Sequence, residues 1–336
     1  MTAQELARRD RIRGCLLGLA VGDAYGAPLE FLRRSAILER FGTDGPSDLE
    51  PWGGHSGGCY TDDTQMSIAT ARGLLDWRAA TGWASGAAVD QDAQDALEHA
   101  VRHRYVEWYR SREWEGRAPG TACLTALGSG IPYESKGCGG VMRVAPLGCA
   151  GLGSAAFEAG ARAAAITHRH HTSDAASGFQ ARLVDWLIGG DELPAAATST
   201  RATLTVWPES RGALDAVNSA IALAGDTRVE TYDALGRIGH VGIETPDERG
   251  KGWVAEEALG IGLFCALRFS GDFAAALRAA AAISGDSDST ASIAGAILGA
   301  AGGPDVIPAA WRDKVEGRDQ LLSLADELAG GEEQGA

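Results

Sequence analysis

Apolar residues recur every three or four positions along most of this chain. The first such segment places five of them at the i, i+3, i+4, i+7 and i+8 spacing of one helix face: Ile12, Cys15, Leu16, Leu19 and Ala20. The same period returns at 97–108, 254–265 and 293–300. A sustained period of this kind is typical of amphipathic helices, so the pattern predicts a mainly helical protein.

Strand signals are few by comparison, and glycine-rich breaks separate the helical segments. The best strand signal, Thr203 to Trp207, is isolated, and one short strand cannot form a sheet, so we expect an all-α fold. The breaks predict loops or surface connections at 41–60, 111–121, 130–140, 189–202 and 239–252. Each is followed by a further helical pattern, unlike an interdomain linker. We therefore expect one domain over 1–336, with a core from about 8 to 328 and a frayed tail.

Composition excludes several functional classes. The 336 residues carry a net charge of −15, which opposes non-specific binding to nucleic acid or anionic lipid. The six cysteines form no C-x-x-C pair, and a disulfide framework is not expected at this length. The N-terminal segment lacks the apolar core of a signal peptide, and the longest apolar stretch, 291–303, falls short of the roughly 20 residues that span a bilayer. We expect a soluble, cytoplasmic protein.

Two clusters of aspartate and hydroxyl residues stand out. Thr61-Asp62-Asp63-Thr64 follows a glycine-rich loop, Asp286-Ser287-Asp288-Ser289 follows Gly285, and each cluster opens a helical segment. For either cluster alone, helix capping is the simpler explanation, because Ser, Thr and Asp are preferred caps. A cap needs one oxygen-bearing side chain, however, and neighbouring carboxylates repel unless a positive charge lies between them. Carboxylate and hydroxyl oxygens are the ligands that hard divalent cations prefer.

Other acidic residues admit two interpretations. Asp23 falls in register with the apolar face of the first helical segment, where it would be buried, but it would face solvent if that helix ended near Gly22. Glu30 lies in a predicted loop just beyond. Glu256 and Glu257 lie on a predicted helix, and at least one of them is expected to face solvent.

Five segments, in chain order, resemble the ADP-ribosylglycohydrolase family, which includes the dinitrogenase reductase-activating glycohydrolases and ADP-ribosyl-acceptor hydrolases. They are GCLLGLAVGDAYGAPLEF at 14–31, YTDDTQM at 60–66, GCGGVMRVAP at 137–146, ITH at 166–168 and GDSDSTASIAG at 285–295. A sixth, at 252–267, resembles a helix common in bacterial members. The resemblance spans nearly the whole chain and implies a compact orthogonal multi-helix bundle.

The resemblance also implies a centre of two divalent cations, Mg²⁺ or Mn²⁺. Its implied ligands are Glu30, Thr61, Asp62, Asp63, Asp286, Asp288 and Ser289. Family members often have threonine at the last of these positions, and Ser289 keeps the hydroxyl. Glu30 is the first candidate for proton transfer, because a loop flanked by glycine and proline is able to move over the site. Asp63 is the second, and acid and base roles are not assigned between them.

A glycine loop and a histidine complete the implied site. Ser135, Lys136, Gly137, Cys138 and Gly139 resemble the loop that holds the diphosphate, where glycines let backbone N–H groups approach phosphate oxygens. A tight turn before a buried helix explains the same residues. Many members carry asparagine where this chain has Cys138. His168 matches the family histidine that contacts ADP-ribose, whereas His170 and His171 are expected in a solvated loop.

These observations lead to one hypothesis and its competitors. The leading one is metal-dependent removal of ADP-ribose from an acceptor, with ADP-ribosylarginine on a protein as the first guess. Serine-linked ADP-ribose, O-acetyl-ADP-ribose and ADP-ribosylated nucleic acid are alternatives, and the acidic charge argues against the last. A second class is an immunity protein that neutralises a toxin ADP-ribosyltransferase, and a third is a structural, crystallin-like protein. The intact Asp clusters favour an enzyme over both.

Overall fold

The protein folds into packed helices, as the apolar period predicts. The computed structural model describes residues 2–43, 45–239 and 251–330. Its longer helices are α1 (Ala3–Gly26), α3 (Asp62–Thr81), α4 (Gln91–Ser111), α7 (Ala155–Ala165), α8 (His171–Gly189), α9 (Leu193–Val206), α10 (Arg211–Gly225), α12 (Ala255–Arg268), α14 (Ser287–Gly302) and α16 (Arg318–Leu328). The shorter ones are η1 (Ala27–Leu29), α2 (Arg34–Phe41), α5 (Thr121–Ser129), η2 (Cys138–Arg143), α6 (Ala145–Gly148), α11 (Thr231–Arg237), α13 (Phe273–Ala281), η3 (Pro304–Val306) and α15 (Ala309–Lys314).

The expected all-α class is confirmed. Within the described ranges, β structure is limited to isolated bridges: Trp52 with His55, Tyr133 with His168, and Gly137 with Val254. The buried apolar residues form one contiguous cluster that reaches from Ile12 to Leu328. No single helix in these ranges is long and apolar enough to cross a membrane. By length and composition alone, the segments Ala3–Leu29 and Arg34–Phe41 would pass together, as a pair bent by 97°.

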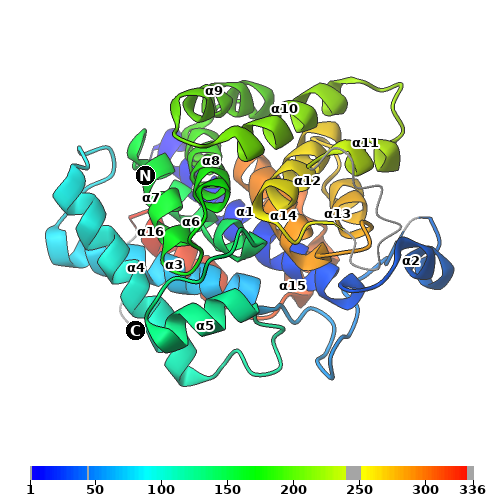
Figure 1. Ribbon diagram of the computed structural model, residues 1–336, viewed down its shortest axis with the longest axis horizontal. Helices are drawn as coiled ribbons and strands as arrows, with labels where there is room; N and C mark the ends of the chain where they lie inside the picture. The colour runs from blue at the N-terminus through cyan, green and yellow to red at the C-terminus, as the bar shows by residue number, and fades with distance from the viewer. Residues whose placement is uncertain (1, 44, 240–250, 331–336) are drawn as a thin grey trace.

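Helices α1 and α14 lie side by side through the centre of the molecule (Figure 1). Glycines on α1 meet the backbone of α14 at every fourth residue, in antiparallel order: Gly14 against Gly299, Gly18 against Gly295, and Gly22 against Ala291. A Cβ atom at any of these three would stand 2.2 Å from a carbonyl oxygen of α14. Only glycine permits this approach, which carries the C-terminal end of α1 to the start of α14.

The region 189–207 corrects two predictions. Both the strand signal Thr203 to Trp207 and the surface connection at 189–202 are wrong, because α9 covers Leu193–Val206. Its buried residues return at helical spacing, and it packs against α8 and α10. Its threonine hydroxyls bond carbonyls within the helix, Thr200 Oγ1 to Ala196 O at 2.8 Å for instance, so tertiary burial outweighs strand propensity here.

The remaining loop predictions have mixed outcomes. The stretches 41–60 and 111–121 are mostly loop, whereas 130–140 runs into η2 at Cys138. The predicted connection at 239–252 lies largely outside the described residues, and so does the tail from 331 onward.

Candidate active site

The first Asp cluster forms the start of α3, and hydrogen bonds to Asp23 hold it in place. Thr61 caps the helix, its Oγ1 accepting the backbone N–H of Asp63 at 3.2 Å. Asp23 accepts the backbone N–H groups of Thr61 and Thr64, each at 2.9 Å, and the Thr64 hydroxyl at 2.6 Å. Asp23 is buried because α1 continues past Gly22 to Gly26, so its alternative as a solvent-facing helix end is wrong. Asp23 therefore orients the segment that carries Asp62 and Asp63.

The second cluster opens α14 and contacts the first. Asp286 is the N-cap residue, and its Oδ1 accepts the backbone N–H of Ser289 at 3.3 Å. The Ser289 hydroxyl donates to Asp63 Oδ2 at 2.9 Å, across 226 positions of sequence. Each cluster thus does cap its helix, but Thr61 and Asp286 suffice for that. Asp62, Asp63 and Asp288 are buried beyond what capping requires.

Both clusters line one cavity of about 330 Å³. Its wall holds most of the predicted site residues: Glu30, Asp62, Asp63, Ser135, Gly137, Cys138, Gly139, His168, Asp286, Asp288 and Ser289. The predicted convergence of Asp62 and Asp288 is therefore present. Two predicted residues, Thr61 and Lys136, lie outside this wall.

Charge repulsion dominates the electrostatics of the cavity. Burial, followed by the charges of Asp288 and Asp286, raises the pKa of Glu30 to about 11. Burial and the charge of Asp288 likewise raise the pKa values of Asp62 and Asp63 well above their ordinary range. Without a compensating positive charge, these carboxylates cannot all be ionised together.

The donor set fits hard cations in its chemistry. Asp62 Oδ2 and Asp288 Oδ1 are buried without a hydrogen-bond partner, as oxygens that serve a further group would be. Carboxylates and the Ser289 hydroxyl are the oxygen donors that Mg²⁺ and Mn²⁺ take. In the described part of the chain, however, no three His, Cys, Asp or Glu side chains already surround one point as a closed metal site would. The ligand chemistry is thus present, while the coordination geometry is not preformed.

The glycine loop approaches His168 closely. Ser135 Oγ accepts the backbone N–H of Gly137 at 3.0 Å, and the Cys138 thiol donates to Asp286 Oδ2 at 2.8 Å. A Cβ atom at Gly139 would stand 2.8 Å from His168 Cε1, so a larger residue there would displace the ring. The thiol of Cys138, where many relatives are expected to carry asparagine, therefore contacts the second Asp cluster.

Lys136 makes a different contact from the predicted one. Its ammonium donates to Glu256 Oε1 at 2.5 Å, and the Glu256 side chain is only 3% exposed. Glu257 is half-buried. The expectation that at least one of these glutamates faces solvent therefore rests on Glu257 alone. The 135–139 loop covers Glu256 at the start of α12 through hydrogen bonds such as Ala255 N to Lys136 O at 2.9 Å.

His168 is held by a buried arginine through a threonine. Arg143 Nη2 donates to Thr167 Oγ1 at 2.6 Å, and the same oxygen lies 2.8 Å from His168 Nδ1. Arg143 only donates, so the Thr167 hydroxyl proton is free to point toward the lone pair of His168 Nδ1. We therefore assign the ring proton to Nε2. Burial, and then the charge of Arg143, lowers the pKa of His168 to about 3, which keeps the ring neutral.

The neighbouring histidines have structural roles. His170 lies in the loop, as expected, but it is only half-exposed, because its Nδ1 accepts the backbone N–H of Thr172 at 3.1 Å and caps α8. His171 is exposed and pairs with Glu209 at 3.0 Å, which matches its predicted solvated position.

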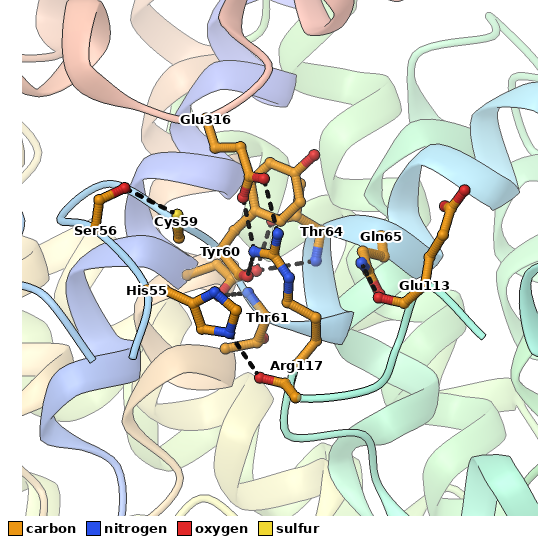
Figure 2. Close-up of polar contacts among 12 residues, drawn as sticks. His55, Ser56, Cys59, Tyr60, Thr61, Thr64, Gln65, Glu113, Arg117 and Glu316 are labelled. Carbon is orange, nitrogen blue, oxygen red and sulfur yellow. Dashed lines mark hydrogen bonds and ion pairs between the residues drawn. The ribbon is translucent and has the colours of Figure 1, made fainter. Parts of the chain in front are cut away.

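The loop before α5 contains Arg117, a residue at the site that sequence reasoning did not single out. Figure 2 shows Arg117 between Tyr60 and Glu316. Arg117 donates to the Tyr60 carbonyl at 2.8 Å and to both carboxylate oxygens of Glu316, at 2.7 and 2.8 Å, while its own carbonyl accepts the N–H of Asp62 at 2.9 Å. The next residues, 118–123, line the cavity. Nothing local in the sequence marks Arg117, because every partner is distant along the chain.

A larger neighbouring cavity, of about 490 Å³, lies between α3 and α4. It is lined by other residues, among them Gln65, Arg104 and Glu107. Arg104 is already paired there with Asp76 and Glu107. The smaller cavity is therefore the better candidate for chemistry, since it holds the acidic clusters.

Comparison with known proteins decides the family. The sequence model of ADP-ribosylglycohydrolases matches residues 4–336. The chain belongs to the ADP-ribosylglycohydrolase family. Family membership supports hydrolase activity.

Individual ADP-ribosylglycohydrolases resemble the chain over nearly its whole length. The ADP-ribosyl-[dinitrogen reductase] glycohydrolase of Rhodospirillum rubrum is 28% identical, with 94% of this chain and 97% of that protein covered. The ADP-ribosylarginine hydrolase Tri1 of Serratia proteamaculans is 26% identical, covering 95% and 79%. The bovine ADP-ribosylhydrolase ARH3 is 25% identical, covering 95% and 92%. A solved ADP-ribosylglycohydrolase-related protein complex superposes with a TM-score of 0.64 at 25% identity, covering 97% of this chain and 99% of its own.

Proposed function

We propose that this chain hydrolyses the bond between ADP-ribose and a modified acceptor, with arginine on a protein as the leading acceptor. One observation carries the proposal: carboxylates from three distant segments line one cavity with a glycine loop and His168. Two relatives support the substrate class, since one is named for ADP-ribosyl-dinitrogen reductase and one for ADP-ribosylarginine.

Two divalent cations, Mg²⁺ or Mn²⁺, fit this proposal. Glu30, Asp62, Asp63, Asp286, Asp288 and Ser289 would hold them, with Thr61 supporting Asp63 through its cap. When bound, such cations orient the hydroxyls of a ribose and lower the pKa of a bound water.

The residues of the chain supply binding and proton transfer. The Gly137 and Gly139 backbone can approach a diphosphate, and a neutral His168 can donate from Nε2 without adding a charge. In hydrolysis, a water oxygen bonds to the anomeric carbon, the bond from that carbon to the acceptor breaks, and the acceptor gains a proton. Glu30 is the leading candidate to carry that proton, because it is half-buried and reaches both cavity and solvent, whereas Asp63 is fully buried.

The test replaces the first Asp cluster. Asp62→Asn with Asp63→Asn should abolish release of ADP-ribose from an arginine-linked substrate and should remove thermal stabilisation by Mg²⁺ or Mn²⁺. A ligand at 100 times its Kd stabilises a protein by about 2.7 kcal/mol, so the loss is measurable. Asp92→Asn is the matched control, since Asp92 lies in the first turn of α4 on the exposed surface.

The helical circular dichroism of the double variant should be retained. Turnover by that variant at the wild-type rate would refute the proposed role of the cluster. Parallel assays with serine-linked, O-acetyl and nucleic-acid-linked ADP-ribose identify the acceptor.

A further inference from the structure

Two aromatic rings stand beside Glu30 at the cavity. Phe31 is 71% exposed although it is large and apolar, and its ring centroid lies 5.2 Å from that of Trp253, with the planes inclined by 31°. Both residues line the cavity. Phe31 is exposed and Trp253 is half-buried, so the packing of the core does not explain this aromatic pair.

The backbone holds Phe31 in this place. Its φ of 65° lies in the left-handed region, which bulky residues rarely adopt. Its N–H donates to the Gly285 carbonyl at 3.3 Å, and Gly285 directly precedes Asp286. Strained positions that the surrounding structure enforces concentrate at functional sites. Phe31 is therefore anchored to the second Asp cluster and remains open on its outer side.

The chemistry of ADP-ribose decides which group would reach these rings. Adenine lies at one end of the molecule, and the acceptor is joined to the anomeric carbon at the other. Two riboses and the diphosphate separate the ends. If the carboxylates hold the distal ribose, as the proposed function has it, the group next to Glu30 is the acceptor and not the adenine.

The charge of the acceptor group distinguishes arginine from the other candidate acceptors. Five carboxyl groups line the cavity, from Glu30, Asp62, Asp63, Asp286 and Asp288, so the wall beside Phe31 favours a positively charged acceptor over a neutral one. A cation over an aromatic face is attracted by its π electrons, and the planar guanidinium group stacks especially well. An arginine keeps this positive charge after it is linked to ADP-ribose, whereas a serine offers no cation.

We propose, resting on the proposed function, that Phe31 and Trp253 form a platform that holds the guanidino group of an arginine acceptor. The platform makes Phe31 a residue that determines which linkage is cleaved efficiently. It leaves the ADP-ribose part of the substrate to the glycine loop and His168.

The test compares linkages in three variants. Phe31→Leu keeps an apolar side chain and loses the aromatic face, Phe31→Tyr keeps the face, and Val206→Ala removes a similarly exposed apolar residue that lies outside the cavity wall. In Phe31→Leu, the KM for arginine-linked ADP-ribose should rise about 5- to 10-fold, as loss of a cation–π contact implies. The KM for serine-linked ADP-ribose and the Kd of free ADP-ribose should change less than about twofold. Phe31→Tyr and Val206→Ala should match the wild type.

Other outcomes overturn the platform. If Phe31→Leu raises the KM equally for every linkage and also weakens the binding of free ADP-ribose, adenine or ribose lies on the rings instead of the acceptor. If the wild type cleaves only another linkage, the platform is refuted while the hydrolase function stands. If the wild type cleaves none, the proposed function fails. Calorimetry then tests the platform by itself. The wild type must still bind arginine-linked ADP-ribose with a lower Kd than free ADP-ribose, and Phe31→Leu must lose that difference in Kd.

Discussion

Replacing Gly18 with alanine is a direct test of how α1 and α14 pack. A Cβ atom there would stand 2.2 Å from the Gly295 carbonyl oxygen and 2.9 Å from its carbon, whereas real Cβ atoms essentially never approach within 3.0 Å. The obstructing atoms are backbone, so no side chain can rotate away. The helices must separate locally by about 0.8 Å, the difference between the 3.0 Å limit and the 2.2 Å contact.

The cost follows from this separation. A gap of about 0.5–1 Å forfeits a quarter to a half of the dispersion attraction between facing atoms. Overpacked cores typically lose about 1–3 kcal/mol, and a backbone obstruction belongs at the upper end. Alanine recovers about 1 kcal/mol through its higher helix propensity. We therefore expect Gly18→Ala to lower the free energy of unfolding by about 2 kcal/mol.

Urea unfolding followed by circular dichroism measures this difference. Gly236→Ala is the control, because Gly236 is an exposed residue of α11 whose Cβ would meet open space. The same substitution should stabilise the protein there by about 0.5–1 kcal/mol. If Gly18→Ala proves as stable as the wild type, backbone-to-backbone contact does not hold α1 against α14.

Two further substitutions examine a hydrogen-bond chain and an ion pair. Thr167→Val removes the hydroxyl between Arg143 and His168, so the imidazole ¹⁵N chemical shifts should show loss of the Nε2-protonated form. Thr167→Ser keeps the hydroxyl and should preserve that form. Identical shifts in the wild type and both variants would contradict the assigned proton position. At Asp326, burial opposes ionisation, but hydrogen bonds from Arg9 and Arg13 outweigh it and lower the pKa to about 2. Because this folded-state value lies below the unfolded one, the stabilisation is present above about pH 4 and is lost as the pH falls through 2. Asp326→Asn should cost about 1–2 kcal/mol at pH 7, because solvent screens a partly exposed ion pair, and this cost should shrink as the pH falls through 2. Thermal melts of both proteins across that range check the prediction, and a cost independent of pH would exclude the ion pair as its source.

Local signals in the sequence were sufficient for the four helices with the clearest apolar period and for the Asp clusters. The apolar period marks α1, α4, α12 and α14, because one face of each is buried. Asp62, Asp63, Asp286 and Asp288 are conspicuous, since each sits among hydroxyl residues at a helix start. The glycines of α1 at every fourth position also form a local pattern that would have predicted close helix packing.

The missed features depend on partners that are distant in sequence. Lys136 was expected at the diphosphate, but its partner Glu256 lies 120 positions away. Arg117 and Arg143 acquire their roles only through Glu316, Tyr60 and Thr167. Segment 193–206 contains β-branched residues that suggest a strand, and only its burial between α8 and α10 makes the helix evident.

The hydrogen bond from Ser289 to Asp63 links the loss of activity on heating to the unfolding of the protein. Many enzymes lose activity first, because their catalytic loops melt before the core does. Here one part of the cavity wall belongs to the central helix pair, since α14 begins at Ser287, carries Asp288 in its first turn and continues into the contact with α1. We therefore expect activity to be lost together with the packing of α1 against α14, because a form in which these helices separate would lack the wall on which Asp63 and Asp288 meet.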